Sequence, residues 1–109
     1  MHPKTIKFRP YLVPLVLSGE KTRTWRMFDD KNFQVGDVVS LLNWETLEDF
    51  GEAKLIDVYE KKFGEVTEED FHGHGPYKNR EEMFTEYRMY YGDKVNEDTL
   101  VKIITFSLI

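Results

Sequence analysis

Nine residues near the start of the chain read Ser18-Gly19-Glu20-Lys21-Thr22-Arg23-Thr24-Trp25-Arg26. The apolar run at residues 11–17 before them ends at Gly19, and glycine at that position is typical of a helix end because it takes positive φ without steric cost. Residues 22–27 then alternate as a strand does, which places Thr24 and Arg26 on one face. We therefore expect a short helix, a turn and a strand that carries polar groups.

The same stretch gathers basic and hydroxyl side chains at one point. Lys21, in the turn before the strand, can bend toward the face that carries Thr24 and Arg26. A threonine hydroxyl becomes a nucleophile when a base removes its proton, and a lysine that is buried near other cations can be that base. The alternative is an ordinary helix-to-strand junction with solvated basic residues, because such residues are usually exposed.

The order of these residues, from Gly19 through Lys21 and Thr24 to Arg26, follows the pattern G-x-K-x-x-T-x-R. This pattern resembles the signature of ASCH domains, a branch of the PUA-like β-barrels. A Pro-Tyr pair at residues 10–11, a Val-Gly-Asp turn at 35–37 and an apolar closing strand extend the resemblance to nearly the whole chain. It implies an α+β fold: a small PUA-like (ASCH) β-barrel with a short helix before the motif strand and a longer flanking helix.

The resemblance also implies an activity. The chain is similar to single-domain ASCH enzymes that hydrolyse N4-acetylcytidine with a lysine base, a threonine nucleophile and a glutamate from a later loop. On this resemblance Lys21 is the base, Thr24 is the nucleophile and Arg26 orients a substrate oxygen. The positions that match the loop glutamate hold His74 and Gly75, so His74 becomes the candidate for the third catalytic role. The nearby carboxylates all lie several residues off register: Glu68, Glu69, Asp70, Glu81 and Glu82.

A loop at residues 71–77 contains two glycines and a proline, so it cannot be regular structure. We expect His72, His74 and Tyr77 to close over a ligand near Lys21, because their rings can stack on a base and form hydrogen bonds. The candidate ligand-binding residues are therefore Arg23, Arg26, Trp25, His72 and Tyr77. A metal site at Asp70, His72 and His74 is the weaker interpretation, since it lacks further ligands, and we expect no metal and no cofactor.

Charge is distributed unevenly along the chain. The net charge is −5, yet residues 1–26 carry six basic residues and one acidic residue. The remainder is therefore strongly acidic, which argues against a general nucleic-acid coat and favours a local anion site. A small ligand is favoured over a long duplex, because neutralising many phosphates needs many cations.

At 109 residues the chain has the length of one domain, and we expect a single ASCH/PUA-like domain over residues 1–109. No cysteine is present, which excludes disulfides and a cysteine nucleophile. No apolar run approaches the roughly 20 residues that span a bilayer, and no signal peptide precedes Pro10, so we expect a cytoplasmic protein without membrane contact.

The rest of the chain supplies the expected framework. Strands are predicted at residues 5–8, 38–43, 53–63 and 100–109, with a loop at 46–50. Asn79 and Glu82 form a capping pair before a helix that ends at Gly92. That helix carries a stripe expected to be mainly core: Met83, Phe84, Tyr87, Tyr90 and Tyr91. Trp44, which can extend the 38–43 strand, is expected to pack inside the barrel.

Together these patterns favour binding of RNA or a modified nucleoside in a basic cleft at Lys21, Thr24 and Arg26. The absence of a glutamate at the expected loop position favours binding over chemistry. N4-acetylcytidine amidohydrolysis is the first alternative. A coactivator-like module that binds a protein partner and no nucleotide is the second.

Overall fold

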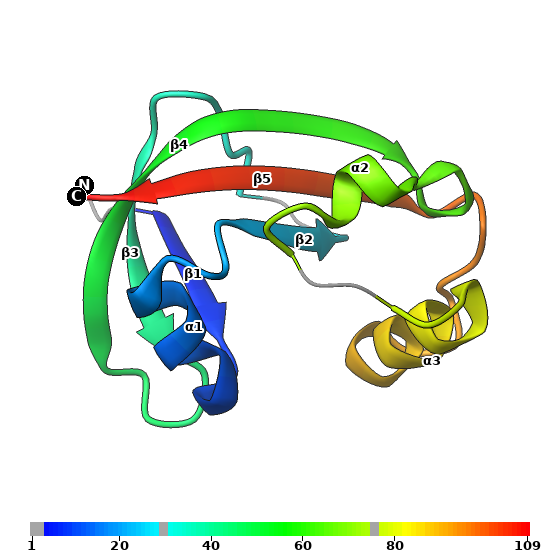
Figure 1. Cartoon of the computed structure of the whole chain (residues 1–109), viewed down its shortest axis with the longest axis horizontal. Helices are drawn as coiled ribbons and strands as arrows, with labels where there is room; N and C mark the ends of the chain where they lie inside the picture. Colours follow the sequence, from blue (N-terminus) through cyan, green and yellow to red (C-terminus); the bar gives the residue numbers. More distant parts are fainter. Residues whose placement is uncertain (1–3, 29–30, 75–76) are drawn as a thin grey trace.

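The computed structural model describes residues 4–28, 31–74 and 77–109. Within these residues, five strands form one sheet in the order β1-β3-β4-β5-β2 (Figure 1). β1 pairs with β3 in parallel, and the other three pairings are antiparallel. The bounds are Lys4–Phe8 for β1, Arg23–Met27 for β2, Val38–Asn43 for β3, Asp49–Lys62 for β4 and Leu100–Leu108 for β5. The sheet is therefore a half-barrel with β1 and β2 as its edge strands, and β2 carries Thr24 and Arg26 of the motif.

The ends of the helices coincide with capping residues in the sequence. The 3-10 turn η1 (Pro10–Leu12) leads into α1 (Val13–Ser18), which ends at Gly19 with φ of 84°. After the turn η2 (Phe63–Glu65), a capping box formed by Thr67 and Asp70 starts α2 (Glu68–Phe71). The longer α3 (Arg80–Tyr91) begins at Asn79, whose side chain accepts a hydrogen bond from the Glu82 amide, and ends at Gly92 with φ of 94°. These caps confirm the predicted helix ends.

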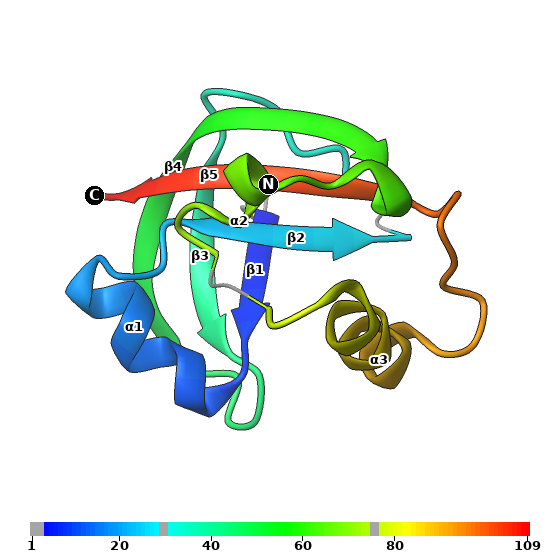
Figure 2. The ribbon, with the colours of Figure 1, turned by 45° about the vertical axis from the view of Figure 1, so that its right-hand side comes forward.

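Two clusters of buried side chains fill the interior. One lies under β1, β3 and α1 and is centred on residues such as Phe8, Val16 and Leu41. The other lies between β2, β5 and α3 and includes Trp25 and Tyr87. Figure 2 shows α1 and α3 on the same side of β2 and β5 but apart from each other. This arrangement confirms the predicted α+β fold, with a short helix before the motif strand and a longer helix on the flank.

β4 differs from its prediction in where it begins and in its regularity. It starts at Asp49, inside the segment predicted as a loop, and runs for 14 residues. A bulge between Leu55 and Asp57 leaves Ile56 without a partner on β5. The alternation of inward-facing and outward-facing side chains is therefore shifted by one residue after the bulge. Leu55 is buried before the bulge and Val58 packs on the core after it. The bulge therefore explains why neither face of this strand has a purely apolar sequence.

The prediction for Trp44 was wrong in both respects. β3 ends at Asn43, because the Asn43 side-chain oxygen accepts hydrogen bonds from the amides of Glu45 and Thr46 and so turns the chain. Trp44 lies in that turn and is 50% exposed. It contributes to a surface rather than to the barrel core.

Candidate functional site

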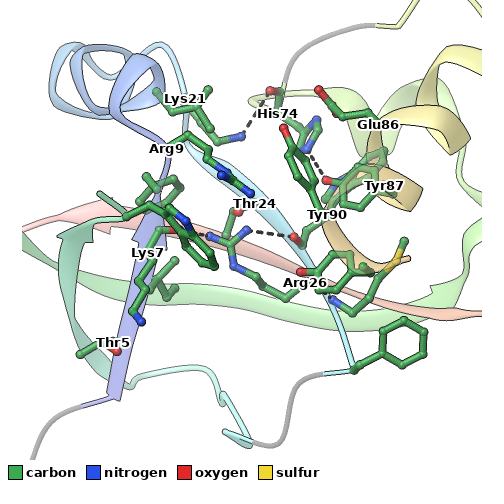
Figure 3. A pocket seen from close by; sticks show the side chains of 18 of the residues that line it. Thr5, Lys7, Arg9, Lys21, Thr24, Arg26, His74, Glu86, Tyr87 and Tyr90 are labelled. Atoms are coloured by element: carbon green, nitrogen blue, oxygen red, sulfur yellow. Dashed lines mark hydrogen bonds between the residues drawn. The ribbon is translucent and has the colours of Figure 1, made fainter. Parts of the chain in front are cut away.

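A cavity of about 450 Å³ opens between the two edge strands and α3. Most of its walls come from four segments that are far apart in sequence: β1, the 21–28 region with β2, the loop after α2, and α3 (Figure 3). Residues of η1 and of the segments before and after β3, including Trp44, complete the lining. Lys21, Thr24 and Arg26 all line it, together with Trp25 from the same strand. The structure thus brings the main motif residues to one concave surface.

Lys21 is a buried amine at the wall of this cavity. Only 6% of the residue is exposed, and its Nζ donates a hydrogen bond to the main-chain carbonyl of His74 at 3.4 Å. Burial, reinforced by the positive charge of Arg26, lowers the pKa of Lys21 to about 8, against a partly compensating effect of Glu86. A substantial share of the amine is therefore neutral near physiological pH, which gives it the character of a base.

Thr24 supplies a hydroxyl to the same space. The residue is 2% exposed and lies opposite Ile104 in the β2–β5 pairing, so the pairing with β5 fixes its backbone. Figure 3 shows Thr24 and Lys21 directed toward the same interior region. A base and a hydroxyl in one cavity meet the first requirement of nucleophilic catalysis.

Arg26 lines the cavity but is tied to the main chain. One guanidinium nitrogen donates to the carbonyl of Lys7 at 2.7 Å, and another donates to the carbonyl of Trp25 at 3.1 Å. Its guanidinium also lies over the Phe8 ring, 5.4 Å from the centroid. Arg26 thus shapes the cavity and holds its charge near Lys21.

The loop after α2 is fastened to the start of β2 through Gly73. The Gly73 carbonyl accepts hydrogen bonds from the amides of Thr22 at 2.9 Å and Arg23 at 3.1 Å. Gly73 has φ of 78°, and a Cβ at this position would collide with Thr22 Oγ1. Glycine is therefore required for the loop to approach β2 closely and to place the next residue, His74, at the cavity wall.

His74 is held on two sides. Its ring stacks on Trp25, with centroids 4.1 Å apart and planes inclined by 17°. Its Nε2 lies 3.0 Å from the Tyr87 hydroxyl. Trp25 is fully buried, and its indole N–H donates to the Asp70 carbonyl at 3.3 Å. Trp25 therefore supports His74. The imidazole stacks on the indole ring where a ligand base was expected to stack.

Glu86 lines the cavity from α3 and was not among the site residues predicted from the sequence. Tyr77, one of the predicted ligand-binding residues, donates its hydroxyl hydrogen bond to this carboxylate. Burial, with contributions from Tyr87 and Glu86, raises the pKa of Tyr77, so the phenol remains a protonated donor. Glu86 is also close enough to affect the pKa of Lys21. The structure therefore supplies a carboxylate to the site from the helix instead of from the loop.

A signal for Glu86 was present in the helical spacing. It lies three residues after Met83 and four before Tyr90, which puts it beside the apolar stripe. That stripe does more than fill the core. Tyr87 is buried, but it lines the cavity together with the partly buried Tyr90 and Tyr91.

Two predicted ligand-binding residues do not line the cavity. Arg23 donates through Nε to the Thr105 hydroxyl at 3.0 Å and through its guanidinium to the Glu69 carbonyl at 2.9 Å, so it fastens α2 to the sheet. Its position one residue before Thr24 turns it to the other side of the strand. His72 is exposed on the loop. Gly75, the other position matched to the family glutamate, lies outside the described residues.

Asp70 serves the fold rather than the cavity. Its carboxylate accepts hydrogen bonds from Tyr59 at 2.6 Å, Lys61 at 2.8 Å and the Thr67 amide at 2.8 Å. Burial alone would raise the pKa of Asp70, but these donors outweigh it and hold the pKa at about 2. Within residues 4–28, 31–74 and 77–109, no group of three histidine or acidic side chains is placed to hold a metal ion.

None of the helices in the described part of the chain has the length and apolar character that crossing a membrane requires.

Solved structures with this fold share little sequence with the chain. Protein EF3133 from Enterococcus faecalis V583 is 20% identical with a TM-score of 0.74, and the match covers 100% of this chain and 81% of that one. The hypothetical protein PH0355 is 19% identical with a TM-score of 0.74, covering 99% and 100%. An ASCH domain from Lactobacillus crispatus JV V101 is 19% identical with a TM-score of 0.62, covering 87% and 68%. No curated protein matches the sequence.

The family assignment rests on the sequence itself as well as on the fold. The family model of the ASCH domain matches residues 4–109, which include the motif strand, the loop after α2 and the helix that carries Glu86. The half-barrel and its helices agree with the solved ASCH domain above. The chain therefore belongs to the ASCH domain family.

Proposed function

We propose that the cavity binds the base of one modified nucleoside, with a cytosine-type base as the best fit. The observation that carries this proposal is the presence of Glu86 and the buried Lys21 and Thr24 together in one cavity with aromatic walls. Its volume of about 450 Å³ falls within the range of small-molecule pockets, roughly 300–1,000 Å³.

The polar groups of the cavity complement a cytosine edge. A glutamate carboxylate accepts a hydrogen bond from the cytosine N4 amino group, and this N–H remains when the nitrogen carries one acyl group. Lys21 and Thr24 can donate to the acceptors of the ring or of the acyl group. Tyr90 and Tyr91 present ring surfaces on which a base can stack. Uracil has an acceptor in place of the N4 amine and would face the Glu86 carboxylate unfavourably.

Calorimetric titration with cytidine, N4-acetylcytidine, uridine and adenosine tests the proposal. We expect the two cytidines to bind at least about tenfold more tightly than uridine, as one well-formed polar pair discriminates. Glu86→Gln should remove most of this preference, and Glu82→Gln, an exposed change on the same helix, should keep it. Absence of binding by all four nucleosides would overturn the proposal and favour the protein-interaction module.

Amide hydrolysis is a second candidate function, and the lowered pKa of Lys21 is the observation that favours it. With a pKa of about 8, about a tenth of the lysine is neutral at pH 7, compared with far less than a hundredth for an ordinary lysine. Neutral Lys21 would take the proton of the Thr24 hydroxyl as the oxygen attacks the acyl carbon. Glu86 replaces His74, Asp70 and Glu69 as the best candidate for the third role.

The remaining steps follow from the same groups. The tetrahedral intermediate collapses with cleavage of the bond between the acyl carbon and N4, and the departing amine takes the proton that Lys21 received. Water then attacks the acyl ester on Thr24, again with Lys21 as base, and releases a carboxylic acid. Nothing beyond the substrate and water is consumed.

Release of cytidine from N4-acetylcytidine, followed by chromatography, tests this chemistry. Thr24→Ala and Lys21→Ala should each abolish turnover, while His74→Ala should reduce it by disturbing the cavity wall. Activity that survives Thr24→Ala, or absence of turnover with several N-acyl nucleosides that bind, would leave the cavity as a binding site only.

A further inference from the structure

The charge that lines the cavity is unlike the charge of the whole chain. Among the residues that the structure describes, five basic side chains and one acidic side chain, that of Glu86, line it, although the chain contains 20 acidic and 15 basic residues. An uncharged nucleoside gives no reason for such an excess, because gathering like charges raises their mutual repulsion. The excess therefore indicates a ligand that carries negative charge.

Part of this basic surface lies at the cavity mouth, where β1 ends. The Arg9 guanidinium lies 4.7 Å from the centroid of the Trp44 ring and 5.1 Å from that of Tyr90. The Lys7 ammonium lies 5.5 Å from the Trp44 centroid. We call Lys7, Arg9 and Trp44 the mouth shelf. All three line the cavity, so the shelf is continuous with the site that holds Lys21 (Figure 3 labels Lys7, Arg9 and Lys21).

The shelf is held in place by the fold. The Trp44 amide donates to the Phe8 carbonyl at 2.8 Å, which joins the β3–β4 turn to the end of β1. On the opposite side the hydroxyls of Tyr11 and Tyr90 are 3.0 Å apart, so η1 and α3 meet beside Arg9. A surface fixed at both ends loses little conformational entropy when a ligand binds.

The printed partners of the shelf cations are aromatic rings and no carboxylate. Among the described residues, carboxylates pair with Lys4, Lys61 and Lys62, whereas neither Lys7 nor Arg9 forms an ion pair. Their charges contact aromatic faces and leave their N–H donors available to an anion. Trp44 is 50% exposed, so part of a large aromatic ring remains accessible to a ligand.

We infer that the mouth shelf is a second subsite, in which Lys7 and Arg9 bind the phosphates, and Trp44 stacks on the adjacent base, of a single-stranded RNA whose modified nucleoside occupies the cavity. This inference rests on the proposed nucleoside site and names its substrate class as a base within an RNA strand. Base–aromatic stacking with neighbouring phosphate contacts is the general means by which proteins hold single strands.

Affinity for two probes tests the inference: cytidine, and a trinucleotide of RNA with cytidine in the middle. We expect the trinucleotide to bind at least tenfold more tightly. Two phosphate contacts should give a slope of log affinity against log salt of about −1.4, since each contact in a single strand contributes about −0.7. Arg9→Gln should lower the trinucleotide-to-cytidine affinity ratio and make the slope shallower by about 0.7. Lys54→Gln, an exposed change on β4 away from the cavity, should alter neither.

Fluorescence supplies an independent readout. The chain has two tryptophans, and Trp25 is fully buried while Trp44 is half-exposed. The trinucleotide should protect Trp44 from acrylamide quenching and cytidine should not, and Trp44→Ala should lower the affinity ratio. Equal affinity for both probes, or unchanged quenching with bound trinucleotide, would overturn the second subsite and leave the nucleoside site standing. Failure of both probes to bind would overturn the nucleoside site and the shelf with it.

Discussion

The Arg26 guanidinium donates a hydrogen bond of 2.7 Å to the main-chain carbonyl of Lys7, and this bond connects β2 with β1. These strands are the two edges of the sheet and do not pair with each other. A side chain therefore joins the open ends of the half-barrel at the cavity (Figure 3). Because the acceptor belongs to the main chain, Arg26 has a structural role that is independent of the side chain at position 7.

Replacing Arg26 with Lys should keep the charge and remove the bridge. A lysine amine cannot reproduce the planar donors that reach two carbonyls, so we expect a loss of about 1–3 kcal/mol in the free energy of unfolding. Lys7→Ala keeps its carbonyl and should change stability by less than about 0.5 kcal/mol. Urea denaturation of both variants measures the difference. Equal losses would show that the Arg26–Lys7 bond contributes nothing specific.

The local elements of this region were predictable because their signals lie within a few residues. Gly19 ends α1 because an αL residue is needed there, and Asn79 starts α3 because its side chain accepts the amide three residues later. The alternation of residues 22–27 likewise predicts β2 from a signal within a few neighbouring residues. The bulge at Ile56 was not predictable, since it depends on the register between β4 and β5.

Gly73→Ala should disturb the cavity wall more than the fold. The added methyl group has no room beside Thr22, and φ at this position is unfavourable for alanine. We expect the loop to move from β2, which weakens the stacking of His74 on Trp25 and the bond from Lys21 to the His74 carbonyl. Gly36→Ala is the control, because it also has positive φ but open space around it. Near-ultraviolet circular dichroism should change for Gly73→Ala, and an unchanged spectrum would contradict this role.

The position of Glu86 in the cavity could not be predicted from the sequence alone. Glu86 lines the same cavity as Lys21, which is 65 positions away in the chain, and this proximity depends on how α3 docks on β2. The family resemblance directed attention to the loop at residues 71–77, where no carboxylate occurs. Helical spacing placed Glu86 beside the tyrosine stripe, yet spacing alone cannot tell a cavity wall from a solvated helix edge.

Lys21→Met should stabilise the protein while removing function. The folded pKa of about 8 is below the ordinary value of 10.5, so the unfolded chain binds more protons between these pH values and stability rises with pH over that window. Below pH 8 the cost of burying the charge is fully present, and methionine removes it. We expect a gain of up to about 3 kcal/mol at pH 7, and a smaller gain at pH 10.

Urea denaturation at both pH values measures this gain, with Lys54→Met as the exposed control. A loss of stability at pH 7 for Lys21→Met would mean that the hydrogen bond to His74 outweighs the cost of burial. Functional sites commonly keep a buried charged group that lowers the stability of the fold, because the group is needed for the chemistry.

Glu86→Gln separates the two effects of this carboxylate on hydrolysis. The negative charge raises the pKa of Lys21 against the effect of burial, so its removal should lower that pKa and move the acidic limb of the rate–pH profile below pH 8. The maximal rate should fall as well, because the variant loses the acceptor for the N4 group. Glu82→Gln should change neither quantity. A limb that stays near pH 8 in Glu86→Gln would exclude electrostatic coupling to Lys21, and a wild-type limb near about 6.5 would instead identify His74 as the titrating group.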